Sequence, residues 1–307
     1  MPFLLPDARL DAMLREDAPY GDMTTLALSI GDRPGRAMLR AGRPMTVCCA
    51  EEAERLFLLA GCTAVRRFAT SGCQLEQGSE ILVAEGPACA LHLAHRTAQV
   101  LMEATSGVAT RARRILLSAR QGRHNIAVAC TRKHIPGTKD AMLKAVLAAG
   151  CTAHRYGQSE SILVFAQHRA FLGRVPPREW IARLRAAQPE RRLVIEAESV
   201  DEAVLFANSG ADCVQLDRMA PEQVAEAVRA IAALGRKVLI AATGGIHEGN
   251  ATAYAMAGAD VLVTSAPYAA PPLDVKVVMA DAHAAPQQGT QLGRSLLATN
   301  CLAGPRP

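Results

Sequence analysis

The amino-acid sequence predicts an α/β protein in which a small N-terminal α+β sandwich domain is followed by a seven-stranded α/β barrel. From residue 126 onward, short apolar runs alternate with helix-favouring segments and the composition stays even, as in barrels of β/α units. Gly210, Gly235 and Gly258 each stand just before the next apolar run, where helix-terminating glycines occur. Residues 35–90 instead show short apolar runs divided by Gly and Pro, which is typical of a small open sheet. For the second region, an open doubly wound sheet is the alternative.

Composition limits the classes of function. Half of the 307 residues are apolar and only 4% are aromatic, so aliphatic side chains must fill a large core. The formal net charge is +5, and no long basic run is interleaved with aromatics, which argues against nucleic-acid binding. No apolar segment approaches the roughly 18–20 residues that cross a bilayer. Because the first residues also lack the basic and apolar regions of a secretory signal, we expect a cytoplasmic protein without a membrane span.

The nine cysteines are scattered and include no Cys-x-x-Cys pair. Cys130, Cys151 and Cys213 lie within or beside apolar strands. Buried reduced thiols fit this pattern better than disulfides or metal ligands.

The N-terminal domain is expected to span residues 1–120. Its predicted elements are a helix at 7–15, a polar loop at 16–25, strands at 36–41, 46–49, 65–69 and 81–85, a helix at 51–60, and a long helix at 92–119 broken at Ser106-Gly107. A final helix is expected near 273–284, within a segment 273–290 that would join this domain. Residues 285–307, rich in Ala, Gln, Gly and Pro, are expected to form a poorly ordered tail.

The barrel is expected over residues 121–272 and would hold the active site. Its strands are predicted at 126–130, at a short run ending at His154, and at 162–165, 193–196, 213–216, 238–242 and 261–264. The connecting helices are predicted at 140–149, 179–187, 200–208, 221–234 and 250–257. In such folds the carboxyl ends of the strands face the same way and bind the ligand.

Polar residues of a definite kind follow the predicted strands. Basic groups come first, carboxylates next and glycine-rich or hydroxyl-bearing turns last: Thr131-Arg132-Lys133, His154-Arg155, Glu196-Ala197-Glu198, Leu216-Asp217-Arg218, Thr243-Gly244-Gly245 and Thr264-Ser265-Ala266. Taken singly, each fits an ordinary solvated surface or tight turn. Their repetition at successive strand ends favours a single binding site.

Each group has a physical use in such a site. A Thr-Gly-Gly turn leading into a helix offers unhindered backbone N–H groups for a phosphate. Two carboxylates bind a divalent cation or ribose hydroxyls. Arg132 and Arg155 can grip carboxylate or phosphate oxygens in bidentate fashion, and Lys133 can act as a point charge. Because converging cations repel one another, they imply a ligand with several negative charges.

These residues resemble the quinolinate phosphoribosyltransferase family, the type II phosphoribosyltransferases. The resemblance runs from Glu16-Asp17 to Asp274, and its specific parts are Gly21-Asp22-Met23-Thr24, His95-Arg96-Thr97-Ala98, Ser106-Gly107-Val108-Ala109-Thr110, Thr131-Arg132-Lys133 with Pro136-Gly137, His154-Arg155 and Thr243-Gly244-Gly245-Ile246. Within the family the chain is most similar to the ModD branch, the pyrophosphorylases associated with molybdenum transport. Pro136-Gly137-Thr138-Lys139 and the run from Ser159 to Phe165 support that closer similarity.

The resemblance implies a homodimer whose subunits complete each other's active sites, and it implies roles for the residues quoted above. Arg96 would reach into the neighbouring subunit's site, and Arg132, His154 and Arg155 would hold the anionic acceptor. Lys133, Glu198 and Asp217 would be catalytic, with Lys133 on the phosphoribosyl donor and the two carboxylates on its ribose, directly or through Mg²⁺. Phosphate contacts would come from Thr131, Lys133, Thr243, Gly244, Gly245, Thr264, Ser265 and Ala266.

The chain departs from the family pattern at several of these positions. The family's Lys-Asp-Asn-His is Phe165-Ala166-Gln167-His168 here, which removes a cation from the acceptor pocket and a carboxylate from the donor side. Other replacements are Ala241 for Glu, Thr243 for Ser, Ser265 for Gly and Tyr268-Ala269-Ala270 for Thr-His-Ser. The planar dianion quinolinate is therefore disfavoured, and Phe165 favours a less charged or more aromatic acceptor.

The first hypothesis is thus an enzyme that transfers a 5-phosphoribosyl group from phosphoribosyl pyrophosphate (PRPP), with Mg²⁺, to a nitrogen of an aromatic or heterocyclic acid. Pyrophosphate is released, and a link to molybdenum transport is expected from the ModD similarity. One alternative is a quinolinate phosphoribosyltransferase of NAD biosynthesis. Another is a non-catalytic barrel that senses an anionic nucleotide or oxyanion. A third, Schiff-base chemistry at Lys133, has only the neighbouring Arg132 in its favour.

Overall fold

The computed structural model describes residues 3–282 and divides them into two compact units. The first, which we call the sheet unit, contains residues 3–110, 137–149 and 270–282. The second, the barrel unit, contains residues 111–136 and 150–269. The expected boundaries near 120 and 272 did not anticipate that 137–149 would belong to the first unit. The expected tail at 285–307 lies outside the described residues.

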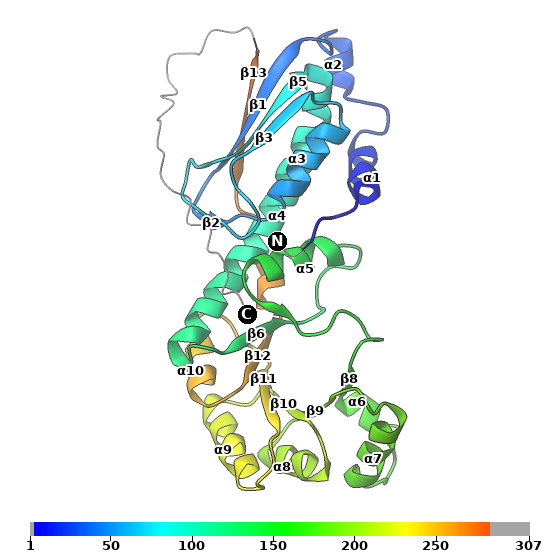
Figure 1. Cartoon of the computed structure of the whole chain (residues 1–307), viewed down its shortest axis with the longest axis vertical. Coiled ribbons are helices and arrows are strands. Elements are labelled where there is room, and N and C mark those ends of the chain that lie inside the picture. Colours follow the sequence, from blue (N-terminus) through cyan, green and yellow to red (C-terminus); the bar gives the residue numbers. More distant parts are fainter. Residues whose placement is uncertain (1–2, 283–307) are drawn as a thin grey trace. The chain divides into compact units, whose positions relative to one another are not determined.

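The sheet unit contains an antiparallel sheet in the order β13-β1-β5-β3 (Figure 1). Its strands are β1 (Pro34–Ala41), β2 (Met45–Thr46), β3 (Ala64–Arg67), β4 (Gln74–Leu75), β5 (Glu80–Pro87) and β13 (Val275–Asp281), with β2 and β4 forming a separate pair. Its helices are α1 (Asp7–Asp17), α2 (Met23–Ala27), α3 (Ala50–Leu59), α5 (Lys139–Ala148) and the first part of α4 (Ala88–Gly122). Alternate residues of β1, among them Ala37 and Leu39, are buried, as a sheet covered on one face requires.

The expected final helix is wrong, because residues 275–281 form strand β13. Val275, Val277 and Met279 alternate with Lys276 and Val278, and the run pairs antiparallel with β1, Val277 lying opposite Leu39. β-branched side chains suit a pleated surface better than a helix. Any helix beyond residue 282 lies outside the described residues.

The expected break in the long helix is also wrong, because α4 runs without interruption through Ser106 and Gly107. The Ser106 hydroxyl accepts a hydrogen bond of 3.0 Å from the backbone N–H of Cys48, so this polar residue serves a tertiary contact. A Cβ at position 107 would lie 2.3 Å from the carbonyl oxygen of Pro271. Glycine is therefore needed there for close packing, at a modest cost in helix propensity.

A buried ion cluster joins α5 to α3 within the sheet unit. Lys144 Nζ lies 2.6 Å from a Glu52 carboxylate oxygen and 3.1 Å from one of Glu51, and the three side chains are almost entirely inaccessible to solvent. Burial alone would raise the pKa of Glu51, but hydrogen bonds from Ser71 and the charge of Lys144 outweigh it and lower that pKa. Arg67 also lies 3.6 Å from Glu51, so two cations face the two carboxylates of this cluster.

The barrel unit has one parallel sheet in the order β7-β6-β12-β11-β10-β9-β8. Its strands are β6 (Ala127–Cys130), β7 (Thr152–Ala153), β8 (Ile162–Val164), β9 (Leu193–Ala197), β10 (Cys213–Asp217), β11 (Leu239–Thr243) and β12 (Val261–Thr264). The helices are α6 (Ala166–Arg169), α7 (Pro177–Ala187), α8 (Val200–Ser209), α9 (Pro221–Ala232) and α10 (Ala251–Met256), with a 3₁₀ turn, η1, at Ala266–Ala269. The predicted alternation of strands and helices is confirmed. β7 and β8 are the two edge strands and do not pair with each other, so the sheet is a half-barrel that is open between them.

Two further sequence expectations concern the chain as a whole. Within residues 3–282, seven cysteines are free thiols, and all of these except Cys89 are buried, whereas Cys73 is disulfide-bonded, against the expectation. None of the helices within residues 3–282 combines the length and the apolar character that a membrane span requires.

Candidate active site

The strand register places most of the singled-out strand ends on one face of the half-barrel. Ala129, Cys213, Ala241 and Val263 pack together and so define the inner face. Side chains alternate along a strand, so the following inward positions lie at the carboxyl ends. In the register of the sheet, Thr152 lies beside Ala129 and Leu163 lies beside Val194, so both face inward. Counting every second residue from these positions gives the inward-facing residues at the carboxyl ends of the strands: Thr131, His154, Phe165, Glu198, Asp217, Thr243 and Ser265.

The basic residues after β6 and β7 converge. Burial, followed by the charges of Arg155 and Arg132, lowers the pKa of His154 from 6.5 to about 4. Burial and the charge of Arg132 likewise lower the pKa of Arg155, and Glu160 opposes both shifts only in part. His154 is therefore neutral at pH 7, and the two guanidinium groups repel each other.

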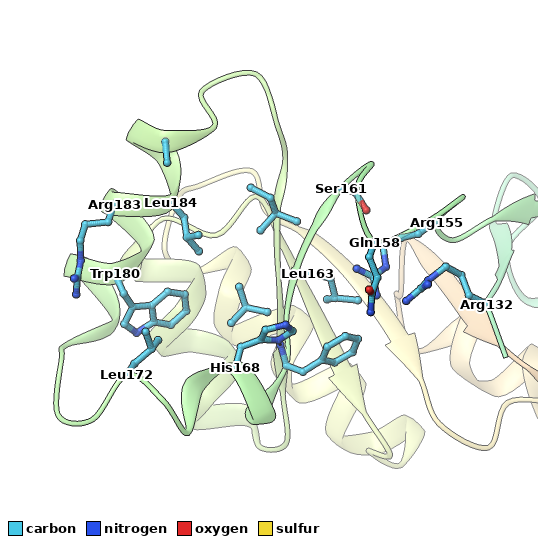
Figure 2. A pocket seen from close by; sticks show the side chains of 14 residues that line it. Arg132, Arg155, Gln158, Ser161, Leu163, His168, Leu172, Trp180, Arg183 and Leu184 are labelled. Carbon is cyan, nitrogen blue, oxygen red and sulfur yellow. The ribbon is translucent and has the colours of Figure 1, made fainter.

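A cavity of about 760 Å³ opens beside this basic group. Figure 2 shows Arg132, Arg155, Gln158 and Ser161 at one end, and Leu172, Trp180 and Leu184 at the other. The Phe165 ring lies between them, 5.6 Å from the Arg155 guanidinium and stacked on His168 at 5.7 Å. The backbone N–H of Phe165 donates to Nδ1 of His168 at 3.0 Å, so a neutral His168 carries its proton on Nε2. An aromatic wall thus stands where the family pattern has a lysine.

The carboxylates at β9 and β10 differ in burial. Glu196 is 9% exposed, and its Oε2 accepts a hydrogen bond of 3.1 Å from Nε2 of Gln215 on the neighbouring strand. Burial first, and then the negative charge of Asp217, raises the pKa of Glu196. Glu198 is exposed, and its backbone N–H donates to Glu202. Asp217 is partly buried, with the exposed Arg218 at 3.6 Å.

The sequence analysis selected Glu198 and did not select Glu196. The structure places Glu196, on the inner face of β9, closer in burial and charge environment to what a catalytic carboxylate needs. The usable signal was the strand itself, since a charged residue in the otherwise apolar run Leu193–Ala197 must face something polar.

The turn after β11 has an open backbone. Gly244 and Gly245 adopt φ angles of 92° and 72°, which glycine accepts without strain. A Cβ on Gly244 would lie 2.7 Å from the Arg218 side chain, whereas nothing lies within 4 Å of one on Gly245. Helix α10 begins only at Ala251, so the anion-binding groups here are turn amides rather than a helix N-terminus.

Two of the predicted phosphate contacts are engaged within the protein. The Thr264 hydroxyl donates to the Ile246 carbonyl at 2.6 Å and accepts from the Ala266 N–H at 3.0 Å, so it ties two loops together. The Thr131 carbonyl accepts a 2.8 Å hydrogen bond from the Tyr268 hydroxyl, which burial keeps protonated by raising the Tyr268 pKa. Ser265 and the turn glycines remain the better candidates for direct phosphate contacts.

The last two predicted residues lie in different environments. Lys133 is exposed, and its N–H donates to the Thr131 hydroxyl at 3.3 Å. Arg96 lies on α4 in the sheet unit, where it is exposed and donates to Gln99 at 3.0 Å. Its expected role in a neighbouring subunit stays a prediction.

Models of a known protein family match most of the chain. The N-terminal domain of quinolinate phosphoribosyl transferase matches residues 22–106, and the C-terminal domain matches residues 108–278.

Individual proteins extend this similarity over nearly their full lengths. A Rhodobacter capsulatus protein named "Putative pyrophosphorylase ModD" is 44% identical over 249 residues, covering 81% of this chain and 95% of the relative. The human nicotinate-nucleotide pyrophosphorylase (carboxylating) is 30% identical over 280 residues, covering 91% and 93%. The crystal structure of NadC from Streptococcus pyogenes has a TM-score of 0.83 at 26% identity, covering 91% of this chain and 99% of that chain.

Proposed function

The chain belongs to the quinolinate phosphoribosyl transferase family, and we propose that it transfers a 5-phosphoribosyl group from PRPP to a ring nitrogen of an aromatic acid. The main support is the composition of the carboxyl-terminal edge of the half-barrel, where successive strands contribute cations, carboxylates and accessible glycine amides. A phosphorylated, pyrophosphate-bearing sugar needs all three groups at once. The family models and the relatives confirm the resemblance inferred from the sequence at the level of the family and of phosphoribosyl transfer.

In the proposed reaction the acceptor nitrogen forms a bond to C1′ of the ribose. The C1′–O bond to pyrophosphate breaks, and its electron pair leaves with the pyrophosphate oxygen. Positive charge grows on the ribose ring as this happens, and Asp217 with the buried Glu196 would stabilise it electrostatically. The acceptor carboxylate would lie between Arg132 and Arg155, which fixes the ring for attack.

Lys133 and the Gly244-Gly245 turn would hold the phosphate groups. Lys133 is exposed, and its ammonium group at the end of a flexible four-carbon stem would act as a point charge on the pyrophosphate. The turn amides would receive the 5′-phosphate.

Mg²⁺ fits the donor set although residues 3–282 contain no cluster of three or more metal-ligating side chains. Glu196, Glu198 and Asp217 supply oxygen donors, and Gln215 Oε1 is buried without a hydrogen-bond partner among the described residues. Mg²⁺ characteristically uses one or two carboxylates plus substrate phosphates and water. Bound with PRPP, it would neutralise charge on the departing pyrophosphate.

The test is PRPP-dependent release of pyrophosphate across a panel of heterocyclic acids. Asp217→Ala should reduce turnover with the active acid by at least about 10²-fold, the usual scale for losing electrostatic stabilisation of a transition state. Asp201→Ala on α8 is the matched control, since Asp201 is exposed and outside the strand-end group. Equal turnover in wild type and Asp217→Ala would reject the assignment.

A quinolinate acceptor, as in NAD biosynthesis, is the second candidate. It is favoured by the name of the human relative and opposed by Phe165, which takes the place of a cation. Direct comparison of quinolinate with monocarboxylic acids in the same assay separates the two.

A sensor without chemistry is the third candidate, suggested by Phe165-Ala166. Calorimetry with PRPP and Mg²⁺ distinguishes it, because a sensor of another anion has no need to bind PRPP. A homodimer with shared sites, a cytoplasmic location and a role in molybdenum transport stay predictions from the family and the ModD similarity.

A further inference from the structure

The cavity beside the basic group extends well beyond the place for a one-ring acid. Its volume of about 760 Å³ lies within the roughly 300–1,000 Å³ that encloses drug-sized ligands. Arg132 and Arg155 occupy only one end of it (Figure 2). A single-ring acid held by these two residues would leave the opposite end empty.

The cavity has this length because β8 is an edge strand. β8 pairs with β9 alone among the described strands, so its other edge has no neighbour. The lining includes residues of both faces, Leu163 and Phe165 from the inner face and Ile162 and Val164 from the outer face. The cavity therefore passes around the edge of the half-barrel, from the acceptor site to the side where α7 lies.

The far end is apolar. Leu172, Trp180 and Leu184 form its wall, and Figure 2 shows the three side chains gathered there. Arg183 is the one charged group at that end among the described lining residues, and it is exposed and 3.6 Å from Glu179 on the same helix. None of the described lining residues is acidic.

The middle of the cavity is flat and aromatic. Phe165 and His168 stack with an interplanar angle of 15°, and Arg155 lies over the Phe165 ring. A second ligand carboxylate here would meet a phenyl ring instead of a cation and would lose its water without compensation. An aromatic ligand ring here would instead remove its apolar surface from water, which is favourable.

We propose that the acceptor is an amphipathic aromatic acid, with one carboxylate at Arg132 and Arg155 and an apolar arm along β8 against Leu172, Trp180 and Leu184. This inference rests on the proposed transfer reaction and names its substrate class. Specificity over one-ring acids would come from the apolar arm.

Trp180 makes the inference directly measurable. It is the single tryptophan of the 307 residues and lines the apolar end of the cavity. Its fluorescence therefore reports an arm that reaches this end.

The binding experiment uses the full chain, with and without PRPP, and three acids that lack a ring nitrogen and so are not consumed. Biphenyl-4-carboxylate should bind at least about tenfold more tightly than benzoate and should change the Trp180 fluorescence, since one extra buried apolar group already gives such discrimination. Benzene-1,2-dicarboxylate should bind no more tightly than benzoate. Equal affinities for benzoate and biphenyl-4-carboxylate, or tightest binding of the dicarboxylate, would overturn the inference.

Two substitutions locate the arm. Leu184→Glu places a carboxylate in the apolar end and should abolish the advantage of biphenyl-4-carboxylate over benzoate. Leu205→Glu is the matched control, because Leu205 is an exposed leucine on α8 that does not line the cavity. Leu184→Ala, a milder change, should reduce the advantage severalfold even where the charged variant folds poorly. An undiminished advantage in Leu184→Ala and Leu184→Glu would contradict the placement of the arm.

The outcome is separable from that of the proposed function. If PRPP is turned over with a one-ring acid and biphenyl-4-carboxylate shows no advantage, the inference fails and the transfer reaction stands. If biphenyl-4-carboxylate binds tightly at Trp180 while no acid supports pyrophosphate release, the cavity is an amphipathic-acid site and the proposed reaction fails.

Discussion

The sheet unit and the barrel unit both bury charged side chains, but they arrange the charges differently. In the sheet unit, Lys144 lies against Glu51 and Glu52, so opposite charges meet. In the barrel unit, Arg132 lies with Arg155 beside the neutral His154, and Glu196 lies with Asp217, so like charges meet. Paired charges stabilise a fold only with both partners present, whereas grouped like charges cost stability until a ligand neutralises them. The difference separates a structural cluster from a binding site.

The largest effect should follow from breaking the paired cluster. Lys144→Met leaves two carboxylates buried without their lysine and should lower the free energy of unfolding by about 3–5 kcal/mol. Urea denaturation measures this loss. Lys139→Met, on the exposed start of the same helix, should change it by less than about 0.5 kcal/mol. Equal losses of unfolding free energy in the two variants would show that the buried cluster does not stabilise the fold more than an exposed lysine does.

The next effect concerns the grouped carboxylates. Glu196→Gln should lower PRPP-dependent pyrophosphate release by about 10²-fold or more. The same variant should have a higher melting temperature at pH 7. Burial and Asp217 raise the folded-state pKa of Glu196 above its unfolded value, so its ionised form costs stability at pH 7, and this cost disappears as the pH falls through those values.

Glu198→Gln is the control for both measurements, because Glu198 is exposed on the same strand end. It should leave the melting temperature unchanged and affect turnover less than Glu196→Gln. The reverse order of activities would restore Glu198 as the catalytic carboxylate chosen from the sequence.

A smaller effect should appear in the pH dependence of anion binding. The free protein holds His154 neutral, with a pKa of about 4, because of burial and the charges of Arg155 and Arg132. A bound carboxylate offsets those charges and raises this pKa, so binding takes up protons and affinity increases as the pH falls from 7 toward 5. The increase is at most about tenfold per pH unit for one proton.

Calorimetry in buffers of different ionisation enthalpy measures the proton uptake. His154→Gln should remove it and leave an affinity that varies little over this range. Proton uptake that persists in His154→Gln would assign it to another group.

The smallest effect concerns the contact that holds the first strand end in place. Tyr268→Phe removes the 2.8 Å hydrogen bond to the Thr131 carbonyl and should cost about 0.5–1.5 kcal/mol of unfolding free energy. KM for PRPP should rise more than kcat falls, because the loop that follows Thr131 carries Lys133. Tyr156→Phe, at an exposed tyrosine, is the control. No change in either quantity would remove Tyr268 from the positioning of the loop.

Much of the fold was readable because its signals are local. Apolar runs such as Val261–Thr264, and glycines such as Gly210 at the end of a helix, depend only on neighbouring residues. The misassigned parts depended on distant ones. Residues 275–281 became a strand because β1 offered a pairing edge, and Gly107 remained in a helix because Pro271 lies close to it.

The site was predicted in the same uneven way. The kinds of group at the strand ends were visible, since parallel strands bring their carboxyl ends together. Glu198 stays a prediction, and the structure adds Glu196 as a second candidate, because its burial and its hydrogen bond from Gln215 of the neighbouring strand could not be seen in the sequence. The long cavity was not visible either, since it exists only where the edge of β8 meets side chains of α7.

By itself, the sequence determined the alternation of strands and helices in the barrel unit, the chemistry of each strand end and the family, because these follow from short-range pattern and motif. The tertiary structure alone decided which charges neutralise one another, which carboxylate is buried and how far the cavity beside Arg132 and Arg155 reaches. These properties depend on distances between side chains far apart in the chain, and electrostatic energy and desolvation change steeply with such distances.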